Sequence, residues 1–270
     1  MAPELNAFVT RIDRVAPGLM ILRVAPDGWE LPNFTPGQFA VLGLPGAAPR
    51  CAEANGEDPP APPDKLLRRS YSIASSSRQK EYLELYVALV RSGALSPRLF
   101  ALYEGDRVWL SPRVSGLFTL DHLPAEANLV LVATGTGLAP YVSMLRSRLV
   151  AEPARRVAVI HGARHSWDLG YRNELLGMQR NFPHLSYIPV VSRPEEEMTP
   201  WPGFCGRVQD AWMAGEVARC WDLAPHPEHT HVLLCGNPDM VEEMTTLLES
   251  QGYRQHSRAA AGQIHAEKYW

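Results

Sequence analysis

The segment "VLVATGTGLAPY", residues 130–141, places two glycines between an apolar run and a helical pattern. An uninterrupted apolar run is typical of a strand that is buried on both faces of a sheet. After the glycines, apolar residues recur at helical spacing, at Leu138, Val142, Leu145 and Leu149. Glycines at such a junction let backbone N–H groups approach a pyrophosphate at a helix N-terminus. We therefore expect Gly135 and Gly137 to bind a dinucleotide, although the third glycine of the usual G-x-G-x-x-G fingerprint is absent.

Strand and helix patterns alternate through the rest of the chain. A strand-like "RVAVIHGA" (156–163) precedes a helical "GYRNELLGMQRNF" (170–182), and "LSYIPVVSR" (185–193) is the next strand pattern. The segment "HVLLCGNPDMVEEMTTLLESQGY" (231–253) again combines a strand with a helix. Such alternation predicts a doubly wound parallel α/β sheet, which we assign to residues 125–270.

Arginines follow several of these predicted strands. Arg164 and Arg193 stand at the ends of two strands, and Arg207 lies just beyond them in "FCGRVQDAW". Ligands of open α/β sheets bind along the carboxyl ends of the strands, so we expect these three side chains in one crevice. Guanidinium groups bind phosphate through paired hydrogen bonds, which indicates the 2′-phosphate of NADP. Each arginine by itself would also fit an exposed, solubilising residue.

The strand pattern of residues 1–124 fits a small antiparallel barrel or sandwich, and we assign a β-barrel. Short apolar runs bounded by proline and glycine occur at residues 19–26 and 38–45, and a Gly-Asp turn precedes another at 107–110. Residues 81–90, "EYLELYVALV", alternate so that one face is apolar and the other carries Tyr82, Glu84 and Tyr86. Residues 45–65 contain six prolines without periodicity, which predicts an exposed, mobile loop.

The composition argues against several classes of function. A net charge of −3 lacks the basic excess of nucleic-acid-binding domains. No apolar run approaches the ~20 residues that span a bilayer, and the first residues do not resemble a secretion signal. The four cysteines are scattered without a Cys-x-x-Cys pair, so we expect no metal centre. We expect a cytoplasmic monomer.

The segment "LLRRSYSIASS" (66–76) carries a family resemblance. Its Arg69-Ser70-Tyr71-Ser72 resembles the Arg-x-Tyr-Ser flavin motif of the ferredoxin–NADP⁺ reductase superfamily. In the same order along the chain, "GALSPRL" (93–99), "SGLF" (115–118), "GTGLAP" (135–140) and "LCGNPDM" (234–240) resemble further motifs of that superfamily. The chain is most similar to the bacterial ferredoxin/flavodoxin reductases, whose tails end in an aromatic pair like Tyr269 and Trp270.

The resemblance implies two sets of cofactor-binding residues. Those implied for FAD are Arg69, Ser70, Tyr71, Ser72, Tyr86, Ala94, Leu95, Ser96, Thr136, Tyr269 and Trp270. Those expected for NADP, from the resemblance and from the strand ends, are Gly135, Gly137, Ala163, Arg164, Ser192, Arg193, Arg207, Gly236, Asn237 and Pro238.

Particular roles are implied for some of these residues. Arg69 would neutralise the FAD pyrophosphate, and Tyr71 would lie against the isoalloxazine ring. Ser72, implied to be catalytic, would hydrogen-bond near N5 of that ring. Trp270, also implied to be catalytic, would stack on the opposite face and move aside for nicotinamide, because hydride transfer needs reacting atoms ~3–3.5 Å apart.

The resemblance implies an FAD-dependent enzyme that transfers hydride between NADP(H) and FAD. Single electrons would pass between FAD and a separate ferredoxin or flavodoxin. Such partners are acidic, so we expect a basic docking face, with candidates Lys65, Arg68, Arg98 and Lys268. The same motifs would serve an NADPH-dependent reductase of free flavins, quinones or an oxygenase component. A non-catalytic NADP-binding subunit is the alternative from another class.

Overall fold

The computed structural model describes residues 4–257 and 259–268, and the chain divides into two compact units. One unit comprises the described residues up to Thr119 together with Val142–Ser147. The other comprises Leu120–Tyr141 and the described residues from Arg148 onward. The assignment of FAD to residues 1–124 and of NADP to residues 125–270 stays a prediction.

The described part of the first unit contains a six-stranded sheet in the order β4-β3-β6-β1-β2-β5, and its neighbouring strands are antiparallel. An antiparallel bridge joins Ile73, the residue after β4, to Leu85 of β5. The two ends of the strand order therefore meet, as in a closed barrel. A short helix, α1, follows β5. The elements are β1 Ala7–Ala16, β2 Leu19–Pro26, β3 Phe39–Pro45, β4 Leu66–Ser72, β5 Leu83–Ala88, α1 Ser96–Leu99 and β6 Arg107–Leu110.

Strand β5 is buried on both faces, whereas its alternation predicts one exposed face. Glu84, on the face with the polar residues, is only 1% exposed. Its carboxylate accepts hydrogen bonds from Arg23 Nε at 2.7 Å and from an Arg146 guanidinium nitrogen at 2.6 Å. A buried carboxylate is tolerated when it is paired in this way. Ion pairs therefore bury the face of β5 that the alternating pattern predicts to be exposed to solvent.

The proline-rich loop, residues 45–65, is anchored by one carboxylate. Glu57 accepts hydrogen bonds from Arg98 at 3.0 and 2.9 Å and from Arg50 at 3.1 Å. Arg98 is only 3% exposed and also donates to the carbonyl groups of Gly46 and Ala94. The expectation that Arg98 contributes to a basic surface is therefore wrong, because its charge is neutralised inside the barrel unit.

Replacing Glu57 tests this anchor through its pH dependence. The hydrogen bond from Arg98, followed by that from the Ala61 N–H, lowers the pKa of Glu57 to about 2. Because the folded-state pKa is below the unfolded value of about 4.3, the carboxylate stabilises the fold above that value. This contribution is lost as the pH falls toward about 2. We expect Glu57→Gln to lower the midpoint of thermal unfolding by several degrees at neutral pH.

Calorimetric scans across pH measure this effect. The difference between the wild type and Glu57→Gln should shrink below about pH 4, where the wild-type carboxylate begins to protonate. Asp64→Asn, an exposed change in the same loop, is the matched control and should leave the midpoint unchanged. If Glu57→Gln lowered the midpoint of thermal unfolding by as much in strong acid as at neutral pH, the ion-pair explanation would be contradicted.

The described part of the second unit is built on a six-stranded parallel sheet in the order β10-β9-β8-β7-β11-β12. Its strands are β7 Asn128–Thr134, β8 Val157–Ala163, β9 Leu185–Val191, β10 Phe204–Cys205, β11 Thr230–Gly236 and β12 Ile264–Lys268. Helix α2, Ala139–Ser147, begins in this unit, and its residues Val142–Ser147 belong to the first unit. The other α-helices are α3 Arg172–Asn181, α4 Val208–Met213, α5 Glu216–Trp221 and α6 Pro238–Ser250. Single 3₁₀ turns occur at Gly135–Leu138, Leu149–Ala151, Ser166–Asp168 and Pro194–Glu196.

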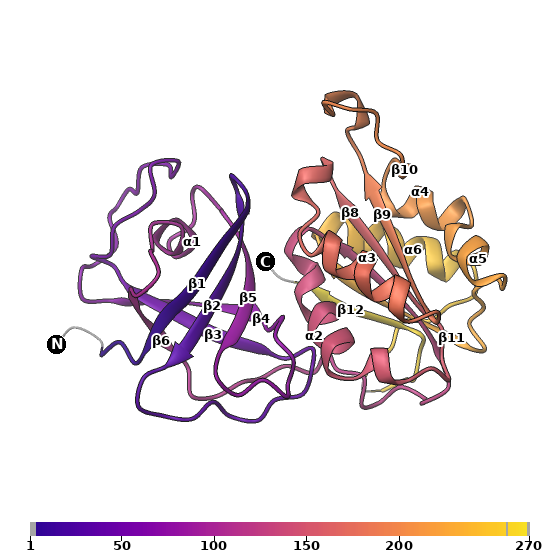
Figure 1. Ribbon diagram of the computed structural model, residues 1–270, viewed down its shortest axis with the longest axis horizontal. Coiled ribbons are helices and arrows are strands. Elements are labelled where there is room, and N and C mark those ends of the chain that lie inside the picture. Colours follow the sequence, from indigo (N-terminus) through magenta and orange to yellow (C-terminus); the bar gives the residue numbers. More distant parts are fainter. Residues whose placement is uncertain (1–3, 258, 269–270) are drawn as a thin grey trace. The chain divides into compact units, whose positions relative to one another are not determined.

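Helices cover both faces of this sheet. Residues of α4, α5 and α6 pack with alternate residues of the strands, such as Val132, Ile160 and Val190. The intervening residues, Leu131 and Val159 among them, are also fully buried, and α3 lies on that side of the sheet (Figure 1). The doubly wound α/β fold and the preceding antiparallel barrel confirm the predicted fold class. Of the described helices, none is long and apolar enough to cross a membrane.

Candidate functional site

The carboxyl ends of β7 and β11 approach each other so closely that glycine is required at two positions. A Cβ added to Gly137 would lie 2.3 Å from the carbonyl oxygen of Cys235. A Cβ added to Gly236, where φ is +139°, would lie 2.4 Å from Oγ1 of Thr134. That hydroxyl accepts the backbone N–H of Asn237 at 2.9 Å. Thr134, which the sequence analysis did not select, therefore helps to fix the two strand ends.

Gly135 has a different environment from Gly137. Its φ is +55°, and nothing lies within 4 Å of the position that a Cβ would take. Thr136, the next residue, is half-buried, and its carbonyl accepts the N–H of Ala139 at the start of α2. Gly135 therefore provides the open part of this turn, whereas Gly137 is required by packing. Pyrophosphate contacts of both glycines stay a prediction.

Two alanine substitutions separate these roles. We expect Gly137→Ala to cost about 3 kcal/mol, because the clash is with backbone and overpacking of this kind costs up to about 3 kcal/mol. We expect Gly135→Ala to cost about 1 kcal/mol, the price of a left-handed conformation without a clash. Urea denaturation of the wild type and both variants measures their free energies of unfolding. Equal losses of stability would contradict the packing role of Gly137.

The three predicted arginines follow three neighbouring strands. Arg164 follows β8, Arg193 comes shortly after β9, and Arg207 comes shortly after β10, and these strands are adjacent in the sheet. Hydrogen bonds of 3.0 Å continue past the strands, from Ser192 N–H to the Ala163 carbonyl and from Arg193 N–H to the Arg164 carbonyl. All three arginines are exposed. The structure therefore places them at one edge of the sheet, the edge at which α/β proteins bind ligands.

The three guanidinium groups differ in their partners. Arg193 pairs with Glu196 at 3.2 Å, and Arg207 lies 3.5 Å from Glu243. The hydrogen bond from His165, together with the charge of Arg193, lowers the pKa of Glu196. Across residues 4–257 and 259–268, no carboxylate pairs with Arg164. An incoming phosphate would compete with a carboxylate for Arg193 and Arg207 but not for Arg164.

The residues after β11 begin helix α6. The Oδ1 atom of Asn237 accepts the N–H groups of Asp239 at 2.7 Å and Met240 at 3.4 Å, which caps the helix. Pro238 occupies the first helical position, where its missing N–H is not needed. Cys235 is fully buried, and burial raises the pKa of its thiol. Asn237 and Pro238, which we expect to contact nicotinamide, therefore also form the start of helix α6.

In the first unit, β4 carries the predicted flavin segment. Arg69 and Ser70 are exposed, Tyr71 is half-buried against the barrel core, and Ser72 is 7% exposed. Arg69 donates to the carbonyl of Arg68 at 2.8 Å, and no carboxylate among the described residues pairs with it. Burial raises the pKa of the Tyr71 hydroxyl. This strand therefore presents an unpaired cation and a neutral aromatic ring. Tyr86, on β5, is only 3% exposed.

The loop before α1 contains the second predicted flavin segment. The Ser96 hydroxyl accepts the N–H of Val90 at 3.0 Å and donates to its carbonyl at 3.3 Å, which closes the loop. Within the described parts of the chain, the backbone N–H groups of Ala94, Leu95 and Ser96 donate to no acceptor. The hydroxyl is thus already used by the loop, and the N–H groups remain as donors. Tyr269 and Trp270 lie outside the described residues.

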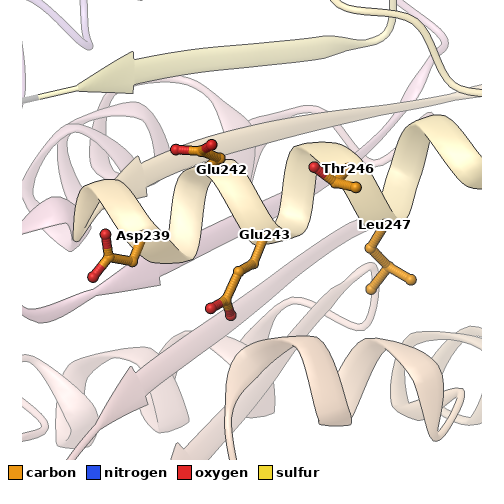
Figure 2. A pocket seen from close by; sticks show the side chains of 5 residues that line it. All are labelled: Asp239, Glu242, Glu243, Thr246 and Leu247. Atoms are coloured by element: carbon orange, nitrogen blue, oxygen red, sulfur yellow. The ribbon is translucent and has the colours of Figure 1, made fainter.

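A hollow beside α6 has the wrong charge for a nucleotide. It is lined by Asp239, Glu242, Glu243, Thr246 and Leu247, and Figure 2 shows the carboxylates projecting from the helix. Three acidic side chains repel phosphate, whereas the edge with Arg164, Arg193 and Arg207 attracts it. The strand ends, and not this hollow, are the candidate nucleotide site.

Comparison with known proteins places this site in a class. Residues 131–246 match the family described as an oxidoreductase NAD-binding domain. The fold resembles the crystal structure of a ferredoxin NADP⁺ reductase from Neisseria gonorrhoeae with bound FAD and NADP. The TM-score is 0.79 at 23% identity, and 97% of each chain is covered. A two-domain oxidoreductase with a nucleotide-binding α/β unit is the class that the fold and these strand ends define.

Relatives of higher identity define the family. A flavodoxin/ferredoxin–NADP reductase of Escherichia coli is 34% identical over 245 residues, which cover 90% of this chain and 89% of the relative. One from Buchnera aphidicola (subsp. Baizongia pistaciae) is 31% identical over 239 residues, which cover 88% of each chain. The chain belongs to the flavodoxin/ferredoxin–NADP reductase family.

Proposed function

We propose that this chain is an FAD-dependent reductase that transfers hydride between NADP(H) and FAD. Single electrons pass between FAD and a separate ferredoxin or flavodoxin, the proteins named for its relatives. One observation carries the proposal. The same chain presents the Arg69–Ser72 segment on a barrel strand and three arginines after adjacent strands of a parallel sheet.

The residues of the first unit fit FAD. Two phosphates require cationic and N–H donors, and a flat ring requires aromatic cover. Among the described residues, no carboxylate pairs with Arg69, and no acceptor binds the N–H groups of residues 94–96. Arg69 therefore offers a positive charge, and the loop offers three N–H donors. A tyrosine hydroxyl is neutral at physiological pH, and burial raises the pKa of Tyr71 further. Its ring can therefore cover the flavin without adding charge.

The chemistry then divides between cofactor and chain. When bound, FAD would supply the hydride and single-electron chemistry. The chain supplies position and electrostatics. Arg69 would hold the pyrophosphate, Tyr71 would orient the ring, and the buried Ser72 hydroxyl would form a hydrogen bond near N5. Tyr86 would contact the ribityl–phosphate region of the cofactor.

The second unit fits NADP. The exposed Arg164, Arg193 and Arg207 would bind the 2′-phosphate, and the turn at Gly135, which has open space beside it, would accept the pyrophosphate. Asn237 uses only its Oδ1 atom to cap α6, and its amide nitrogen donates to no acceptor in the described part of the chain. That nitrogen is available to nicotinamide. Backbone groups of Ala163, Ser192, Gly236 and Pro238 line the same edge.

Arg164→Ala tests the 2′-phosphate site. A charge-assisted hydrogen bond contributes about 1.5–3 kcal/mol, so we expect KM for NADPH to rise at least about tenfold. KM for NADH, which lacks the 2′-phosphate, should stay nearly unchanged. Arg180→Ala, an exposed arginine of α3 away from the strand ends, is the matched control. An equal rise in KM for both nucleotides would contradict the assignment.

The partner surface and the setting of the enzyme are further parts of the proposal. Arg68 and Lys65 are exposed near the start of β4, and the Arg68 guanidinium lies 5.7 Å from the ring centroid of Trp109. With Arg98 buried, these two residues remain as described candidates for binding an acidic acceptor.

We propose that the enzyme works as a cytoplasmic monomer. Cell fractionation tests the compartment, and sedimentation tests the oligomeric state.

Anaerobic titration of the yellow protein with NADPH and then NADH tests the proposed function. We expect NADPH to bleach the flavin at far lower concentration than NADH. Turnover with ferredoxin or flavodoxin should then exceed turnover with free flavins or quinones and should fall as ionic strength rises. A colourless protein, or a flavin that NADPH does not bleach, would favour a non-catalytic nucleotide-binding subunit.

A further inference from the structure

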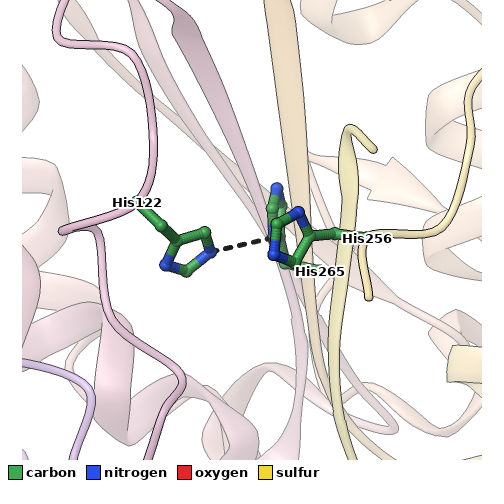
Figure 3. A group of neighbouring side chains, drawn as sticks. All are labelled: His122, His256 and His265. Atoms are coloured by element: carbon green, nitrogen blue, oxygen red, sulfur yellow. Dashed lines mark hydrogen bonds between the residues drawn. The ribbon is translucent and has the colours of Figure 1, made fainter. Parts of the chain in front are cut away.

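Histidines from four segments of the second unit meet at one place. We call His122, His231, His256 and His265 the histidine cluster. His122 lies in the loop 121–127 before β7, His231 is in β11, His256 is in the segment between α6 and β12, and His265 is in β12. His265 pairs with Leu233 across the parallel strands, so it shares a face of the sheet with His231. Figure 3 shows the rings of His122, His256 and His265 turned toward one another.

The distances in the cluster suit metal coordination. One ring nitrogen from each of His122, His256 and His265 lies within 4.8 Å of the other two. His122 Nε2 and His265 Nδ1 are 3.2 Å apart. Zinc–nitrogen bonds of about 2.0–2.1 Å in a tetrahedral site separate two ligand nitrogens by ~3.3 Å. The pair is therefore already at a ligand–ligand spacing, and His256 must move closer to it to complete three ligands.

The surroundings fix which nitrogens are available. His231 Nδ1 lies 3.0 Å from His265 Nε2, so His265 Nδ1 is the nitrogen that faces His122. The N–H of Gly262 donates to His256 Nδ1 at 3.5 Å, so the proton of the neutral His256 ring lies on Nε2 in this geometry. Binding of a metal ion by Nε2 therefore requires this long contact to open and the proton to move to Nδ1. Metal-binding histidines donate the N–H of their second nitrogen to an acceptor that holds the ring in place, a role that His231 Nδ1 fills for His265 Nε2.

The cluster opens toward solvent. His265 is 6% exposed at its base, whereas His122 and His256 are exposed. A metal ion can therefore approach the three rings from the solvent side.

We propose that His122, His256 and His265 bind one divalent transition-metal ion of the zinc class, with His231 as the positioning residue for His265. Water completes the coordination. Among the described residues this group of ligands consists of imidazoles alone, which select Zn²⁺, Co²⁺, Ni²⁺ or Cu²⁺ over Mg²⁺ and Ca²⁺. The ion ties the loop before β7 to the edge strand β12, and it does so independently of the proposed reductase activity.

Isothermal titration of the full-length, untagged holoenzyme with Zn²⁺ tests the site. We expect one ion per chain, and at least tenfold weaker binding in His256→Ala, whose side chain is exposed and whose loss leaves the core intact. His226→Ala removes another exposed histidine of the same unit and should bind like the wild type. His231→Gln should retain binding at reduced affinity, because the three ligands remain.

Two further measurements make the outcome decisive. Co²⁺ should give the intense visible bands of a four-coordinate site in the wild type and lose them in His256→Ala. Zn²⁺ should raise the thermal midpoint of the wild type and of His226→Ala, but not that of His256→Ala. No zinc binding, or binding that His256→Ala leaves unchanged, overturns the proposal and identifies the cluster as a chain of hydrogen-bonded neutral histidines.

Discussion

The close approach of β7 to β11 is the constraint on which the candidate nucleotide site depends. The carbonyl of Cys235 occupies the space that a side chain at residue 137 would need, and Thr134 binds the N–H of Asn237. These contacts fix where α2 and α6 begin relative to the central strands. The adjacent ends of β8, β9 and β10 then present their arginines along the same edge. The proposed phosphate site depends on this strand geometry, because the backbone alone brings the three arginines to one edge of the sheet.

Periodicity in the sequence predicts much of this fold. Continuous apolar runs in the second half and short, punctuated runs in the first half gave the parallel sheet and the antiparallel barrel, and the structure has both. The predicted strand over 19–26 coincides with β2. Strand β12 was missed, because residues 264–268 alternate only weakly and sit near the chain end, where a tail is the simpler expectation. Its pairing with β11 is a tertiary interaction that local pattern does not encode.

Long-range pairs account for the rest of what the sequence could not predict. Glu57 and Arg98 are separated by 41 residues, and their ion pair turns a proline-rich loop into an anchored one. Arg98 was misjudged for that reason, since a single arginine is ordinarily a surface residue. Thr134 and Asn237 are 103 residues apart. The histidine cluster spans 143 residues, so no spacing rule for metal ligands could reveal it. Strand ends were predictable because topology alone brings them to one edge.

The proposed function requires NADP to bind at the carboxyl ends of the parallel strands. Hydrogen exchange measured with and without NADP⁺ tests this requirement, because bound phosphate protects the amides that it contacts. We expect slower exchange in residues 134–138, 163–165, 192–194 and 235–238, with no change at the opposite ends of the same strands. Protection confined to α6 around Glu242 and Leu247, or absent from all four segments, would contradict it.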